Sequence, residues 1–116
     1  MRLFIDVDCS HATGWEGYDY VVNRLSPTDG TTLLEACSGN SWIWDRGQRV
    51  HYEVQGNKMF VVVPRRYLGL RRGQSVRIQF KWSDNMQQEG DILDFLTNGD
   101  VAPLGRFNYE FTISDF

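Results

Sequence analysis

Acidic side chains with alternate spacing stand where the first apolar segment of the chain ends. Asp6 and Asp8 follow directly on Leu3-Phe4-Ile5, and Ser10 continues the same spacing. On an extended chain, two carboxylates one residue apart point to the same side, and they repel unless a cation or hydrogen bonds compensate. Oxygen ligands spaced by two residues also open the calcium loop of an EF-hand.

This acidic segment has two interpretations, and the sequence leaves both open. In the first, a calcium ion is held by oxygen atoms of Asp6, Asp8, Ser10, Glu16 and Asp19. The EF-hand pattern is incomplete, because His11 stands where glycine is needed and Gly17 where a bidentate glutamate is needed. In the second, the carboxylates accept hydrogen bonds from backbone N–H groups of their own turn, as aspartates in turns commonly do.

Tryptophans near predicted turns are the second group of residues that could bind a ligand. Trp15, Trp42 and Trp44 lie in or beside such turns, whereas Trp82 ends an alternating segment and is expected in the core. Exposed aromatic rings can stack on sugars, and neighbouring polar groups then bind the hydroxyls. The candidate polar partners are Glu16, Asp45, Arg46 and Asn85. The alternative is that all four rings are buried.

Other catalytic or metal-binding patterns are absent from the sequence. His11 and His51 have no serine or cysteine at a recognisable catalytic spacing. Cys9 and Cys37 form no zinc motif, so they are either one disulfide or two small apolar side chains. Haem binding is not predicted, and no pair of carboxylates is placed as acid and base across a cleft. We therefore predict that the protein is not an enzyme.

Composition excludes two classes of partner. The chain has 116 residues, enough for one domain, and 14% of them are aromatic. Its net charge of -3 gives no electrostatic reason to bind nucleic acid. No apolar run approaches the roughly 20 residues that a membrane-spanning helix needs.

Two-residue periodicity predicts the fold. Val76, Ile78, Phe80 and Trp82 alternate with polar residues and indicate a strand with one buried face. We predict about seven strands, near residues 2–7, 18–25, 31–38, 50–54, 59–63, 76–82 and 107–113, with a short element at 42–47. The apolar segment 59–63 is expected to be central, and 64–70 to form one helical turn. The fold class is a single antiparallel β-sandwich, jelly-roll-like.

Three stretches together resemble a known group of domains. Segments 3–8 with 13–20, 80–85 and 90–109 resemble family-nine carbohydrate-binding modules and the wider DOMON-like domains. The resemblance spans nearly all of the chain, as the C-terminal two-thirds of such a domain. It implies a non-catalytic carbohydrate-binding or accessory module of a secreted or envelope bacterial protein, with calcium as a ligand. The alternative is a structural or protein-interaction domain without a small-molecule ligand.

The resemblance also implies that strands are missing before residue 3. The strand at residues 3–7, or a neighbour of it, would then lack a partner. Because an open apolar edge tends to pair with another chain, we expect a homodimer through that edge.

Overall fold

The described part of the chain contains eight strands and a short 3₁₀ turn, and Ile92 and Phe95 are helical as well. The computed structural model describes residues 1–70, 75–84, 88–92, 95, 100–103 and 108–113, and the side chains of Arg46 and Ile113 lie outside that set. The strands are β1 (Arg2–Asp6), β2 (Tyr20–Val22), β3 (Thr31–Cys37), β4 (Trp44–Gln55), β5 (Lys58–Val62), β6 (Val76–Asp84), β7 (Asp100–Ala102) and β8 (Tyr109–Ile113). A 3₁₀ turn, η1 (Arg65–Leu68), joins β5 to the segment before β6. No helix among the described residues has the length and apolar character needed to cross a membrane.

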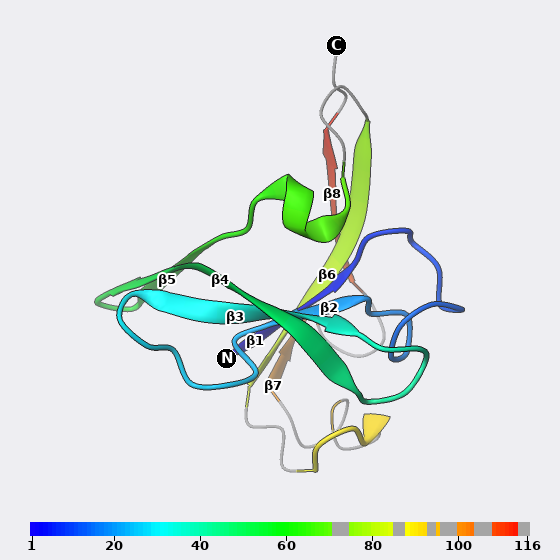
Figure 1. Cartoon of the computed structure of the whole chain (residues 1–116), viewed down its shortest axis with the longest axis horizontal. Helices are drawn as coiled ribbons and strands as arrows, with labels where there is room; N and C mark the ends of the chain where they lie inside the picture. The colour runs from blue at the N-terminus through cyan, green and yellow to red at the C-terminus, as the bar shows by residue number, and fades with distance from the viewer. Residues whose placement is uncertain (71–74, 85–87, 93–94, 96–99, 104–107, 114–116) are drawn as a thin grey trace.

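The strands form one antiparallel sheet, so the predicted antiparallel all-β class is confirmed. The order is β5-β4-β3-β2-β1-β6-β7, and β8 pairs with β6 beside β7 (Figure 1). Residues of β4 and β5 pack into one cluster with residues of β6, although β3, β2 and β1 lie between β4 and β6 in the sheet. The sheet is therefore curled into a half-barrel, with a concave and a convex face.

Strand β1 lies in the middle of this sheet. Phe4 is in register with Val21 of β2 on one side and with Lys81 of β6 on the other. The prediction that the strand at residues 3–7 lacks a partner is wrong for β1, because both of its edges are paired. Among the described strands, the edges without a paired neighbour are those of β5 and of β7 and β8.

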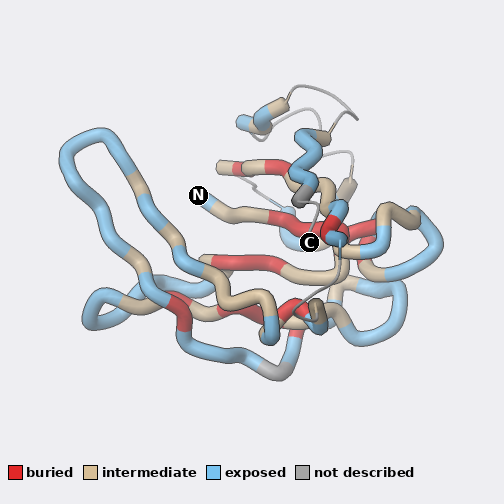
Figure 2. The backbone as a smooth tube through the Cα atoms, turned by 90° about the horizontal axis from the view of Figure 1, so that it is seen from above, coloured by how far each residue is buried: buried red, intermediate tan, exposed pale blue. Residues whose placement is uncertain are grey.

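Each face of the sheet carries its own hydrophobic cluster. Alternation along β1 sends Phe4 to the convex face and Ile5 to the concave face. The convex cluster contains Phe4, Trp15, Tyr18, Val21, Trp44 and Phe95. The concave cluster contains Ile5, Val22, Leu34, Val50 and Leu68. Figure 2 shows the buried residues along the middle of the strands and the exposed ones at the peripheral loops.

Two sequence predictions about strands 42–63 are wrong. Residues 44–55 form one long strand, β4, and Gly47 lies inside it rather than ending a separate element. Segment 59–63 is not central: β5 is an edge strand whose residues alternate between exposed and half-buried. Apolar content alone could not distinguish a buried strand from an exposed one that is apolar on both faces.

Strand β6 is buried on one face of its C-terminal half and half-buried on the other. Val76, Ile78 and Phe80 face the concave cluster, as their alternation predicts. Lys81 and Ser83 on the opposite face are nevertheless fully buried, because the convex cluster covers them. The Lys81 ammonium donates a hydrogen bond to the carbonyl oxygen of Pro103, and burial lowers the pKa of Lys81.

The predicted helical turn after β5 is confirmed as η1. Pro64 precedes it, and Gly69 ends it in the left-handed conformation with φ of 73°. Leu68 of this turn is buried in the concave cluster and holds η1 against the sheet.

Candidate functional site

The loop between β1 and β2 is built on a tight turn that ends at Tyr18. Trp15 and Tyr18 exchange backbone hydrogen bonds of 2.9 and 2.8 Å. Glu16 and Gly17 between them have positive φ angles of 49° and 93°, as a two-residue hairpin turn requires. The turn directs Trp15 and Tyr18 into the convex cluster and leaves Glu16 exposed at its tip.

Three carboxylates meet at the base of this loop. One oxygen atom each from Asp6, Asp8 and Asp19 lies within 4.8 Å of the other two. Asp6 and Asp8 come from the end of β1, whereas Asp19 comes from the segment that leads into β2. The backbone N–H of Asp19 donates to the carbonyl of Ile5 at 2.8 Å, and this bond brings the two ends of the loop together.

Backbone N–H groups and one hydroxyl group already bind these carboxylates. Asp6 accepts from the backbone N–H groups of Asp8 and Ser10, both at 3.3 Å. Asp8 accepts from the Ser10 N–H at 3.1 Å and from the Thr13 hydroxyl at 2.7 Å. Asp19 accepts from the Val7 N–H at 3.0 Å. The backbone hydrogen bonds that the second interpretation predicts are thus present, and Thr13 is a partner that sequence reasoning missed.

The proximity of the three acids changes their protonation. Burial raises the pKa of Asp6 to about 7, and the hydrogen bond with Asp8 and the charge of Asp19 add to the increase. Burial alone would raise the pKa of Asp8 as well, but hydrogen bonds from Thr13 and Asp6 lower it below its usual value. Near neutral pH, Asp6 is therefore partly protonated and shares its proton with Asp8.

The arrangement also has the oxygen atoms that calcium requires. Calcium–oxygen distances of about 2.3–2.6 Å place ligands on one ion at separations up to about 5 Å, so a mutual spacing of 4.8 Å is compatible with shared coordination. Asp6, Asp8 and Asp19 are the residues that could hold the ion. Ser10 contributes its backbone N–H to the carboxylates, and Glu16 does not belong to the cluster. Among the described residues, none of the three acids forms a salt bridge.

The predicted sugar-stacking tryptophans are in the core. Trp15 is 4% exposed and Trp44 is also buried, while Trp42 is half-buried against them. The Trp15 and Trp42 ring centroids are 4.5 Å apart with an interplanar angle of 77°, so the rings meet edge to face. Trp42 and Trp44 meet at 89°. The prediction of an exposed pair of stacking rings is wrong here, because Phe4 and its neighbours already cover the ring faces.

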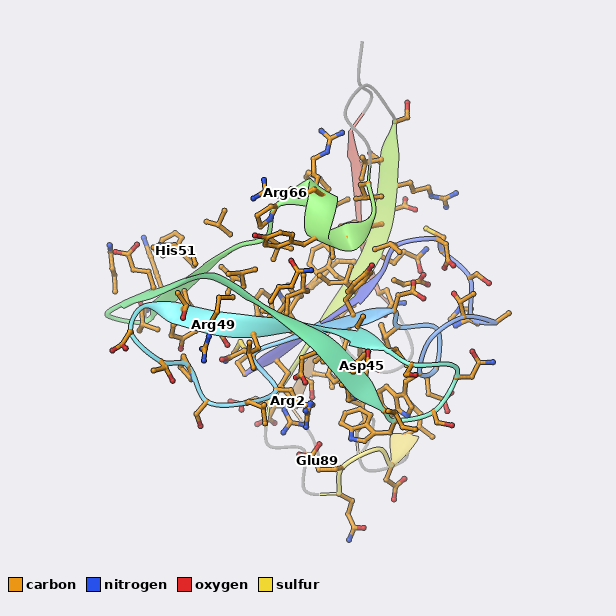
Figure 3. The ribbon with its side chains drawn as sticks, viewed as in Figure 1. Arg2, Asp45, Arg49, His51, Arg66 and Glu89 are labelled. Carbon is orange, nitrogen blue, oxygen red and sulfur yellow. The ribbon has the colours of Figure 1, made fainter. Side chains whose placement is uncertain are left out.

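Two of the four polar residues predicted beside these rings are described, and both are exposed. Glu16 is exposed at the tip of its turn, and Asp45 is exposed on β4 (Figure 3). Asn85 and the side chain of Arg46 lie outside the described residues. Cys9 and Cys37 are free thiols rather than a disulfide.

Sequence reasoning missed an apolar trough on the concave face. A cavity of about 380 Å³ lies between β1, β5, η1, β6 and β8. Its twelve lining residues are apolar except for Arg65: Leu3, Ile5, Val61, Val63, Leu68, Leu70, Val76, Ile78, Phe80, Trp82 and Phe111. Trp82, expected in the core, is half-buried in this wall. The alternation of β6 and β8 gave the apolar faces, but only the curled sheet sets them opposite β5.

The chain has no match among protein-family models, curated proteins or solved structures. The resemblance to family-nine carbohydrate-binding modules and DOMON-like domains therefore stays a prediction from the residues that carry it.

Gly14 should be irreplaceable in the acidic loop. A Cβ atom at this position would lie 2.0 Å from the carbonyl oxygen of Tyr18, and φ is 72°. Gly39 is the matched control, since its φ is 68° but no atom lies within 4 Å of its Cβ position. We expect Gly39→Ala to cost about 1 kcal/mol of unfolding free energy, and Gly14→Ala at least about 3 kcal/mol. Equal losses in urea unfolding would show that the loop shifts freely.

Asp6 should make stability depend on pH. An aspartate whose pKa is raised in the folded state stabilises the fold below its unfolded pKa near 4, and this contribution is lost as the pH rises towards 7. Burial also raises the pKa of Asp19, which adds to this loss, whereas the lowered pKa of Asp8 acts below pH 4 and does not offset it. In chelator-treated protein, we expect the free energy of unfolding to fall by roughly 2 kcal/mol between pH 4.5 and 7.5, and Asp6→Asn should abolish most of this fall.

The control for this experiment is Asp45→Asn, which removes an exposed carboxylate on β4. In urea unfolding, Asp45→Asn should show the same decline in unfolding free energy between pH 4.5 and 7.5 as the unsubstituted chain. The same slope in Asp6→Asn and in the unsubstituted protein would contradict the assignment to Asp6.

Proposed function

We propose that this chain is a non-catalytic interaction or accessory domain whose concave trough receives an apolar segment of a partner protein. The observation that carries the proposal is the trough of about 380 Å³, whose lining residues are apolar with the exception of Arg65. Exposed apolar area of this kind costs free energy in water, and its burial by a ligand recovers that free energy.

The shape of the trough favours an extended polypeptide as the ligand. It is only partly enclosed, and its lining residues extend from Val61 of β5, at one edge of the sheet, to Phe111 of β8 at the other. Phe111 of β8 remains 46% exposed at its wall, which leaves room for a partner side chain. An extended segment places alternate side chains on one face, so it can fill an apolar channel while its other face stays solvated.

Carbohydrate binding and an extracytoplasmic location remain predictions from the resemblance. A sugar would find aromatic rings in the trough, at Phe80, Trp82 and Phe111, rather than at Trp15, Trp42 or Trp44. Few polar groups there are placed to bind hydroxyls, and this supports the protein-interaction alternative over the carbohydrate one.

A peptide selection tests the trough. We expect displayed peptides with alternating apolar residues to bind, and to shift the backbone NMR signals of Ile5, Ile78 and Phe111. Phe111→Glu should weaken the selected peptides at least tenfold, because a carboxylate would be desolvated at the apolar wall. Ile43→Glu is the control: Ile43 is 56% exposed, compared with 46% for Phe111, and lies outside the trough.

Other outcomes would change the assignment. If no peptide binds but fatty acids shift the same backbone NMR signals, the ligand of the trough is a small apolar molecule rather than a protein. Glycan-array binding that is lost on substitution of Trp82 would favour the carbohydrate function. Peptide binding unaffected by Phe111→Glu would overturn the placement in the trough.

Calcium binding at the acidic loop is the second candidate, supported by carboxylate oxygens of Asp6, Asp8 and Asp19 that all lie within 4.8 Å of one another. Calcium should raise the melting temperature and give heat in calorimetry, and Asp8→Asn or Asp19→Asn should abolish both effects because each removes a charged oxygen ligand. Glu16→Gln, an exposed change in the same loop, should keep the response. Absence of heat and of any melting shift in the unsubstituted protein would contradict calcium binding.

A further inference from the structure

The hairpin of β4 and β5 exposes apolar side chains on both of its faces. It projects to one side of the molecule, where His51 is labelled in Figure 3. Phe60 and Val62 of β5 are 46% and 57% exposed on one face, and Val54 of β4 is 54% exposed on the other. Within the part of the chain that the structure describes, β5 pairs with β4 alone, so its other edge is open.

The register of the hairpin shows which backbone groups this open edge offers. The two-residue loop at 56–57 closes on Gln55 and Lys58, a pair that exchanges both backbone hydrogen bonds. Bonded and non-bonded pairs alternate along an antiparallel ladder, so Lys58, Phe60 and Val62 face β4. Met59 and Val61 therefore direct their N–H and C=O groups away from β4, toward the open edge.

We propose that β5 pairs antiparallel with β5 of a second copy of this chain, around a two-fold axis at Phe60. In this register Met59 of one copy lies opposite Val61 of the other, and the two residues exchange both hydrogen bonds. Phe60 lies opposite Phe60 as a closely spaced non-bonded pair. Every outward backbone group of Met59 and Val61 gains a partner, and the two exposed Phe60 rings cover each other.

Charge and sequence support a second copy as the occupant. Lys58 is the only charged residue of β5. In the proposed register it lies opposite Val62 of the other copy, so the two lysines stay at opposite ends of the interface and do not face each other. The segment ends at Pro64, which has no N–H to extend the ladder. The edge is thus self-complementary over the length of β5.

The interface should be weak. Two paired five-residue strands bury less than the roughly 1,200 Å² that stable complexes need. We expect a dissociation constant on the order of 0.1 mM, with a monomer–dimer equilibrium in sedimentation velocity between about 10 µM and about 1 mM. The inference does not rest on the trough ligand: it uses the backbone edge of β5 and the Phe60 ring, which does not line the trough, whereas the Val61 side chain does.

Charge substitutions at Phe60 test the register. Phe60→Glu and Phe60→Lys should each raise the dissociation constant at least tenfold, because like charges would stand directly opposite each other. An equal mixture of the two variants should regain the dimer, since only pairing around Phe60 sets these charges together. Val54→Glu is the matched control, an apolar position on β4 that is similarly exposed, and should leave the dimer unchanged.

Three results would overturn the proposal. The first is a monomer at all concentrations up to about 1 mM. The second is a dimer that persists in both Phe60 variants, which would place the interface elsewhere. The third is loss of the dimer without recovery in the mixture, which would exclude the two-fold register around Phe60.

Discussion

The two-sided burial of β1 is the constraint on which the rest of this structure depends. Strand β1 has a paired strand along each edge and an apolar cluster on each face. A chain of 116 residues must therefore build two clusters from one sheet. The convex cluster is closed by loops that carry Trp15, Trp42 and Phe95, whereas the concave one is closed by the curl of the sheet and by η1. The loops that close the convex cluster include the acidic loop, whereas the curl of the sheet that closes the concave cluster leaves the trough open.

Aromatic rings are used mainly for packing in this protein. Phe4 contacts five other rings, with centroid distances from 5.2 to 6.1 Å. Such tilted and edge-to-face contacts stabilise a core beyond the area they bury. The same demand leaves Trp15 and Trp44 without an exposed ring face, which is why residues suited to sugar stacking by type do not form that site. Buried charge accompanies the rings: Glu35 pairs with Arg24 at 2.8 Å beneath the convex surface.

Local patterns predicted most strands, the helical turn at η1 and the acidic loop, but they failed at β5 and at the tryptophans. The alternation from Val76 to Phe80 reflects the local geometry of an extended backbone, and these residues do form a strand, β6. The apolar run Met59 to Val63 carries no information about its neighbours, and pairing with β4 alone made it an edge. Asp6 and Asp8 could be placed together from their spacing. The position of Asp19 depended on the loop closing through its backbone bond to Ile5.

The sequence by itself determined the antiparallel β class, the turn positions set by glycine and proline, and the close approach of Asp6 and Asp8. These follow from two-residue periodicity and backbone preferences, which act over a few residues. Only the tertiary structure decided which strand is central, which edge is open, and which rings are covered. Those properties arise from pairing between distant segments, such as Phe4 with Lys81, and neither segment encodes that choice alone.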